Sequence, residues 1–166
     1  QGMIVAELEE IILEHSCDIR ESFQSLAKLD VILAFSSCAE DLELVRPQFT
    51  QVKKTIHIQD GRHPLQELIS ETEFVPNHVS LDPNERIVIL SGPNYSGKSV
   101  YLRQVGLLVY MAHLGCFIPC SQATLSVVDQ ICTRICTVET CAVPQSSFQL
   151  DLTQMASILH KATSNS

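Results

Sequence analysis

Apolar residues recur at helical spacing over the first 46 residues, and the stretch from residue 3 to residue 46 contains neither glycine nor proline. This pattern predicts one long helix, or two consecutive helices with a break near Ser16 and Cys17, ended by Pro47. Fully helical, 44 residues would span about 66 Å, which is longer than a compact domain of this size needs. We therefore interpret residues 1–46 as a connecting element. A helical hairpin packed on the domain is the alternative.

A different pattern follows Pro47. Residues 55–59 alternate between apolar and polar as a strand does, and a turn with His63 leads into a short helix that Pro64 opens. We interpret His63 as a turn residue that bonds the backbone, in preference to an acid–base group. A short strand or loop is expected up to residue 81, then a turn over 82–85 and an apolar strand over 86–90.

The second half of the chain predicts more helix than strand. Residues 99–114 have the period of an amphipathic helix, and Gly115 stands where a C-terminal glycine cap belongs. Strand segments are expected at 125–128 and 130–136, then a loop, and a final helix over 148–162. The inner face of the first of these helices is expected to carry Leu102, Val105, Leu108, Val109 and Ala112.

The motif that carries chemistry lies between the apolar run and this helix. The sequence Gly92-Pro93-Asn94-Tyr95-Ser96-Gly97-Lys98-Ser99 fits the phosphate-binding pattern G-x-x-x-x-G-K-[ST]. Backbone N–H groups at a helix N-terminus attract a phosphate. Lys98 would reach the β and γ phosphates, and the Ser99 hydroxyl would ligate Mg²⁺. A chance match in a glycine-containing turn is the alternative.

Charge and cysteine content narrow the class of protein. The net charge is −8, and residues 1–46 hold ten acidic against three basic residues, so no basic stripe for a nucleic-acid backbone is visible. The seven cysteines lack zinc-site spacing, and we interpret them as buried free thiols in a reducing compartment. The absence of a signal pattern or a long apolar run favours a soluble, intracellular chain.

A nucleotide hydrolase also needs an acidic residue at a strand end on the Mg²⁺ side. After Lys98 the acids are Asp129, Glu139 and Asp151, and neither Asp129 nor Asp151 stands at the end of a convincing strand. We expect the strand that carries this acid to lie beyond residue 166. Gln1 in the place of an initiating methionine also suggests a fragment.

Together these motifs resemble the MutS family of DNA mismatch-recognition and recombination ATPases over essentially the whole chain. The resemblance rests on the GRHP sequence at residues 61–64, FVPN at 74–77, GPNYSGKS at 92–99, YLRQ at 101–104 and GCFIP at 115–119. Pro144-Gln145 and the LDL sequence at 150–152 are more similar to the meiotic branch, specifically the fifth eukaryotic homologue, than to repair members.

The resemblance implies an α/β fold: part of a P-loop, ABC-type ATPase domain over 47–166, with residues 1–46 as the end of the lever helices. It implies that Phe74 stacks on adenine, that Asn94 belongs to the phosphate loop, and that Ser146 approaches the γ-phosphate in a partner subunit. Pro144-Gln145 departs from the Gly-Arg of repair members and weakens the role of Ser146. ATP and Mg²⁺ are the implied cofactors.

The implied partners are DNA, bound through parts of the parent protein outside this chain, and another MutS homologue in a heterodimer, in the nucleus. The parent would be an ATP-dependent ATPase, and residues 1–166 alone would bind nucleotide without hydrolysing it. Two other readings stay open. A P-loop kinase would need several phosphate-clamping arginines, whereas only Arg103 and Arg134 follow the loop. The second alternative is a scaffold protein that keeps the phosphate loop, does not hydrolyse nucleotide, and acts by pairing with a partner subunit.

Overall fold

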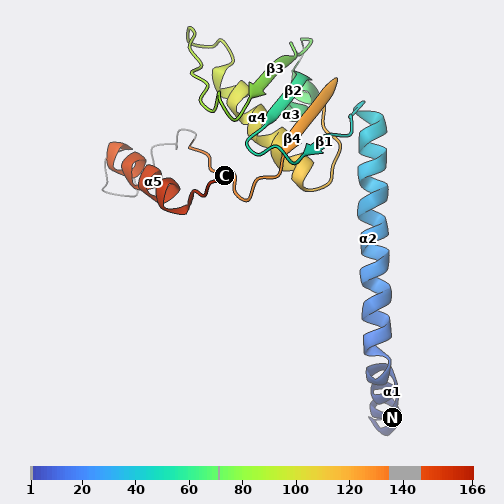
Figure 1. Ribbon diagram of the computed structural model, residues 1–166. Coiled ribbons are helices and arrows are strands. Elements are labelled where there is room, and N and C mark those ends of the chain that lie inside the picture. Colours follow the sequence, from blue (N-terminus) through green and yellow to red (C-terminus); the bar gives the residue numbers. More distant parts are fainter. Residues whose placement is uncertain (1, 71, 135–146) are drawn as a thin grey trace. The chain divides into compact units, whose positions relative to one another are not determined.

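The computed structural model describes residues 2–70, 72–134 and 147–166 of the chain, which forms two compact units, Gln1–Asp41 and Leu42–Ser166 (Figure 1). The first unit consists of helices α1 (Gly2–Glu14) and α2 (Ser16–Asp41). The predicted break between two helices is confirmed, since His15 separates them.

Helix α2 ends five residues earlier than the sequence predicts. Val45 forms a β-bridge with Ile118, in which each backbone N–H donates to the other residue's carbonyl at 2.8 and 3.0 Å. A residue in a bridge cannot also continue a helix, so pairing with residue 118 ends the helical region before Pro47 is reached.

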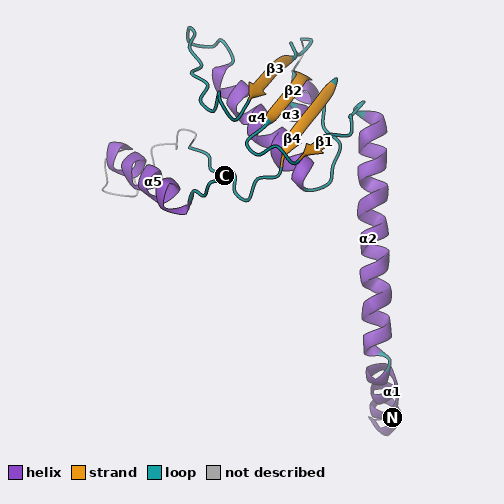
Figure 2. Cartoon of the chain, in the orientation of Figure 1, coloured by secondary structure: helices purple, strands orange, loops and turns teal. Residues whose placement is uncertain are grey.

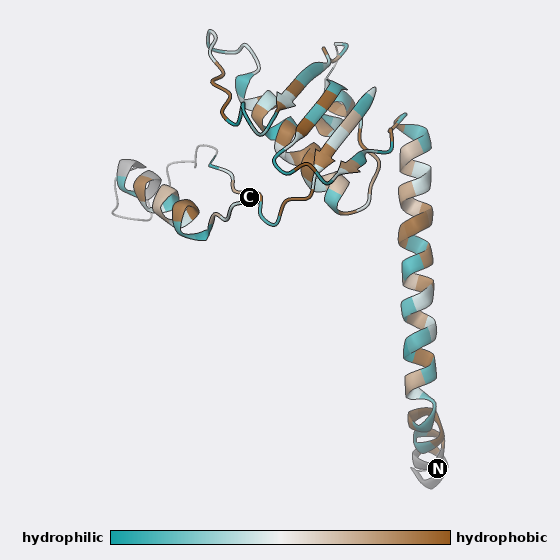
Figure 3. Ribbon diagram, in the orientation of Figure 1, coloured by the Kyte–Doolittle hydropathy of each residue, from teal (hydrophilic) through white to brown (hydrophobic). Residues whose placement is uncertain are grey.

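No described side chain of α2 is buried, and apolar residues occur at many points along the helix (Figure 3). Among the described residues, no helix is both long and apolar enough to cross a membrane.

The second unit contains four strands and three helices in its described residues (Figure 2). In chain order they are β1 (Gln48–Thr50), β2 (Ile56–Gly61), α3 (Pro64–Ile69), β3 (Asn77–Leu81), α4 (Lys98–His113), β4 (Gln122–Ser126) and α5 (Ser147–Lys161). The predicted helices after His63 and after Gly97, the final helix and the strand around residues 55–59 are thereby confirmed.

The strands form one mixed sheet in the order β1-β4-β2-β3. β1 runs parallel to β4, whereas β2 is antiparallel to both β4 and β3. The register aligns Gln48, Thr124, His57 and Ser80 across the four strands, and their neighbours Phe49, Leu125, Ile56 and Leu81 form the next row. Because side chains alternate along a strand, the first row faces away from the core and the second row faces toward it.

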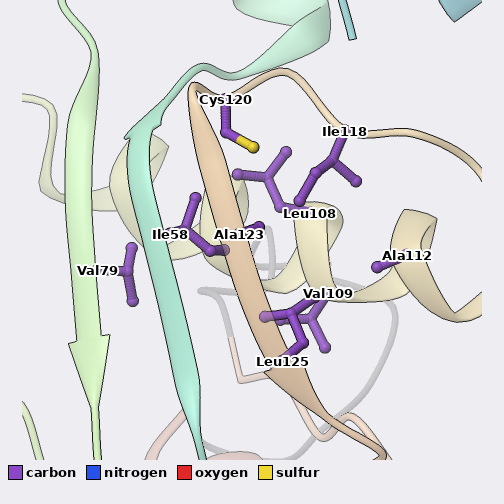
Figure 4. Close-up of a cluster of buried hydrophobic side chains, with 9 residues drawn as sticks. All are labelled: Ile58, Val79, Leu108, Val109, Ala112, Ile118, Cys120, Ala123 and Leu125. Carbon is purple, nitrogen blue, oxygen red and sulfur yellow. The ribbon is translucent and has the colours of Figure 1, made fainter. Parts of the chain in front are cut away.

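The core lies between this sheet and α4. Ile58, Val79, Ala123 and Leu125 point from the strands toward Leu108, Val109 and Ala112 of the helix (Figure 4). Leu102, expected on the inner face of α4, is instead 57% exposed, and Gln104 is fully buried. At the N-terminal end of α4, the buried face therefore differs from the predicted one: it contains Gln104 and does not contain Leu102.

Two predicted strands are absent from the described residues. Residues 86–90 have no regular secondary structure, and Ile87 and Ile89 are 85% and 88% exposed. A strand forms only where a neighbour accepts its backbone hydrogen bonds, and the sheet contains no neighbour for this run. Residues 130–134 also form no strand, and residues 135 and 136 of that prediction lie outside the described part of the chain.

The cysteines are less buried than the composition suggests. Cys17, Cys38 and Cys132 are exposed free thiols, whereas Cys120 is buried beside Ile118 in the core. Burial raises the pKa of the Cys120 thiol to about 11, so this group stays protonated at neutral pH. Within the described residues, no group of three histidine, cysteine or acidic side chains could hold a metal ion.

Candidate phosphate-binding site

Helix α4 begins at Lys98, immediately after the glycine that caps it. Gly97 adopts φ +86° and ψ 6°, a left-handed backbone conformation that residues other than glycine rarely adopt. Residues 91–97 are all exposed. A glycine in this conformation thus precedes a helix that begins at Lys98, whereas the strand expected before the loop is absent from the described residues.

The Lys98 ammonium lies inside the loop that precedes it. Its Nζ donates to the carbonyl oxygens of Gly92, at 2.7 Å, and of Pro93, and lies 3.4 Å from Ser96 Oγ. A cation held against the loop backbone at a helix N-terminus creates a concentrated positive potential at the place where a phosphate would bind. The predicted role of Lys98 is thus compatible with its position.

Ser99 is the second residue of α4, and its side chain is exposed. Its hydroxyl can supply one oxygen ligand to a cation. Mg²⁺ retains several waters and is commonly held by one or two protein oxygens together with substrate phosphates. Ser99 therefore fits the Mg²⁺ role as a single protein ligand beside the phosphates.

The remaining predicted site residues have varied positions. Asn94 and Tyr95 form an exposed turn in the loop, with Tyr95 at φ +64°. Phe74 is half-buried in the segment between α3 and β3, before the first residue of β3, Asn77. Ser146, the residue expected to approach a partner's nucleotide, lies outside the described residues.

His63 is confirmed as a residue that bonds the backbone. It is the N-cap of α3, and its Nδ1 accepts a hydrogen bond from the Gln66 N–H at 3.4 Å. Burial lowers the pKa of His63, a hydrogen bond with its own backbone opposes that shift, and the positive charge of Arg103 adds to the lowering. A neutral imidazole is the form that can accept the cap hydrogen bond, so this histidine stabilises α3.

Three polar residues to which the sequence motifs assigned no role connect α4 to the start of β3. Gln104 Oε1 accepts from Asn77 Nδ2 at 3.2 Å, and the Tyr101 hydroxyl donates to the His78 carbonyl at 3.0 Å. Asn77 belongs to the FVPN sequence, and Tyr101 and Gln104 belong to the YLRQ sequence. The only physical signal in the pattern was Gln104, a polar residue beside the apolar positions of an amphipathic helix. Helical periodicity alone places it near the edge of that face, where a glutamine is ordinary.

Two cavities in the second unit do not involve the loop. One, of about 1040 Å³, has a lining that includes Lys54, Arg86 and Val128, and the other, of about 670 Å³, has one that includes Arg46, Phe49 and Phe117. Since no residue from 92 to 99 lines either cavity, the candidate phosphate site is an open loop at a helix end.

The fold and the loop together define a mixed α/β protein that carries a phosphate-loop motif at the start of α4. Residues 88–166 match the family model MutS domain V, which is an ATPase domain. This region is similar to the MutS family, whose members bind ATP with Mg²⁺, bind DNA and form dimers. The matched region contains most of the apolar run, the complete phosphate loop and all of α4.

Proposed function

We propose that this chain is the ATP-binding part of a MutS-like DNA-binding ATPase, in which ATP drives a dimeric clamp switch on DNA. One observation carries the proposal: the match to MutS domain V includes a loop in which the Lys98 ammonium lies against the Gly92 and Pro93 carbonyls, next to the N-terminus of α4. Phosphate binding by such a loop depends on positioned backbone donors and one cation.

Each site residue then has a specific task. Lys98 neutralises charge on the β and γ phosphates, Ser99 supplies an oxygen to Mg²⁺, and the backbone of the other loop residues, Gly92 to Gly97, surrounds the phosphate. Phe74 stacks on the base, because a flat apolar ring gains most from contact with another flat ring. Mg²⁺, when bound, neutralises charge that develops on the phosphate oxygens. Ser146 would act on nucleotide bound by the partner subunit.

The finer assignment rests on sequence. Pro144-Gln145 and the LDL sequence at 150–152 favour a role in meiotic recombination over mismatch repair, as a nuclear heterodimer with another MutS homologue. We place the DNA contacts outside residues 1–166, because this chain has a net charge of −8 and its first 46 residues are strongly acidic.

Replacement of Lys98 tests the phosphate-binding loop. Because hydrogen bonds to charged groups contribute about 1.5–3 kcal/mol, Lys98→Ala should weaken ATP binding roughly 10- to 100-fold. Affinity is measured by titration calorimetry with Mg²⁺ present. The control is Lys53→Ala, which removes the same charge from an exposed position outside the loop and should leave the affinity unchanged.

Equal ATP affinity in the wild-type chain and in Lys98→Ala would exclude the loop as the phosphate site. The same samples should be assayed for released phosphate in the presence of DNA and of the partner subunit. ATP binding that depends on Lys98 but never leads to hydrolysis would favour the scaffold reading over the ATPase. Transfer of the γ-phosphate to a small molecule would favour the kinase.

A further inference from the structure

Two side chains of α4 hold the first residues of β3. Asn77 Nδ2 donates to Gln104 Oε1 at 3.2 Å and to the carbonyl of Val75 at 3.1 Å. One turn before Gln104 on the helix, the Tyr101 hydroxyl donates to the carbonyl of His78 at 3.0 Å. Two hydrogen bonds thus fix the start of β3 to α4. One joins two side chains, and the other joins a side chain to the backbone.

Gln104 is fully buried, which is unusual for a glutamine. Its Oε1 is bonded to Asn77, whereas its Nε2 has no partner among the described residues. A Cβ atom on Gly61 would lie 2.8 Å from that Nε2, so the glycine leaves room for the amide. A buried amide that makes only part of its hydrogen bonds stabilises a core less than an apolar side chain of similar size. Stability alone therefore does not account for a glutamine here.

The position of Gln104 in the chain suggests another role. Helix α4 begins with Lys98 of the phosphate loop, and Asn77 is three residues after Phe74. Three residues of extended chain span at most about 11 Å, and the Asn77 side chain also bonds the Val75 carbonyl within this segment. The Asn77–Gln104 bond thus connects the helix that carries the phosphate loop to the segment that carries Phe74.

We propose that the Asn77–Gln104 pair is a positioning element that fixes the Phe74 segment relative to the phosphate loop. The pair thereby sets how strongly a nucleotide base contributes to binding beyond its phosphates. This inference rests on the proposed function, because it takes Phe74 and the loop as the two halves of one nucleotide site. Neither residue touches the nucleotide. Both act through the segment from Phe74 to Asn77.

The test compares ATP with inorganic tripolyphosphate, which binds the loop but has no base. Gln104→Met keeps the length of the side chain and removes the bond to Asn77. It should weaken ATP about tenfold, a typical effect of losing one base–aromatic stack, and leave tripolyphosphate affinity unchanged. Phe74→Ala should give the same selective loss, and the double variant should lose little more than either single one, because both changes remove the same contact.

Gln130→Met is the matched control, since it makes the same chemical change at an exposed position and should alter neither affinity. Equal loss of ATP and tripolyphosphate in Gln104→Met would overturn the inference, as would unchanged ATP affinity. If Gln104→Met does not fold, Tyr101→Phe removes only the second tether and should shift the ATP to tripolyphosphate ratio in the same direction; an unchanged ratio then also overturns it. A wild-type chain that binds neither compound contradicts the proposed function itself.

Discussion

Gly61 ends β2 at a point where the sheet has no room for a side chain. A Cβ there would meet Gln104 Nε2 at 2.8 Å, Ile58 Cγ2 at 3.1 Å and the Asn77 carbonyl at 3.2 Å. The carbonyl belongs to the backbone of the neighbouring strand and cannot move independently of it. A single methyl group at residue 61 would therefore disturb the sheet and the Asn77–Gln104 pair together.

Gly61→Ala should lower the free energy of unfolding by about 1–3 kcal/mol, the typical cost of overpacking. Gly106→Ala is the control. An added Cβ at Gly106 has no neighbour within 4 Å, and alanine inside a helix is more favourable than glycine by up to about 1 kcal/mol. Urea denaturation followed by circular dichroism measures both values. Equal stability of the two variants would show that the sheet can widen at residue 61.

His63 links stability to pH through its cap on α3. Burial holds the pKa of the folded-state imidazole below the ordinary value of 6.5. The stability that the neutral ring contributes is fully present above about pH 6.5, and it is lost as the pH falls through the lowered pKa of the folded state. His63→Asn keeps an N-cap acceptor and removes the titration.

The free energy of unfolding of His63→Asn should therefore fall less than that of the wild type between pH 7 and pH 5. Urea midpoints at half-unit pH steps measure this difference, and the comparison cancels the contributions of the other histidines. Parallel curves for the two proteins would mean that His63 gains protons equally in the folded and unfolded states, contrary to its burial.

Among the elements, the run over residues 86–90 shows most clearly what a sequence pattern leaves open. The four side chains after Arg86 are apolar, but Val88 and Leu90 are 55% and 38% exposed, and Ile87 and Ile89 are 85% and 88% exposed. The pattern records a preference for a buried strand and does not specify the partner strand. Exposed apolar segments of this kind promote association between chains.

Ile89→Thr should reduce concentration-dependent aggregation and change the free energy of unfolding by less than about 0.5 kcal/mol, because the Ile89 side chain has few neighbours to lose. Leu108→Ala, at a fully buried position of α4, should instead cost about 2–5 kcal/mol. Light scattering over a concentration series and urea denaturation measure the two effects. A large loss of stability in Ile89→Thr would mean that the run is packed in solution.

The elements that the sequence predicted correctly are those with local causes. Alternation over 55–59, proline at the start of α3 and the glycine before Lys98 each act within a few residues, and the structure contains β2, α3 and the start of α4 there. The early end of α2 depends on the Val45–Ile118 bridge, whose partners are distant in sequence. The exposure of residues 86–90 likewise depends on the sheet.

The residues of the candidate site also fall into two groups: those that a local motif predicts and those that meet only in the folded chain. The loop, Lys98 and Ser99 belong to one contiguous motif, so the sequence alone predicts them as candidate site residues. Asn77 and Gln104 come together only because β3 lies against α4, and they are separated by the whole loop. No spacing rule connects such a pair. Phe74 was predicted as a site residue from the family resemblance alone, because no physical property of the neighbouring residues indicated it.

At the level of the whole second unit, the strand order determines which contacts close the fold. β4 lies between β1 and β2, although it is the last of the four strands in sequence. Its middle residues also contribute Ala123 and Leu125 to the core against α4. The sheet without β4 would consist of the antiparallel β2–β3 pair and an isolated β1 of three residues.

This order has a consequence for synthesis. A ribosome makes the chain from the N-terminus, so β1, β2, β3 and α4 all emerge before the strand that joins them. Two-stranded hairpins are at best marginally stable in water, and pairing across long sequence separations is slow. The nascent second unit thus remains without a closed core until residue 126 has left the ribosome, and the growing chain is exposed to chaperones and to misassociation throughout that interval.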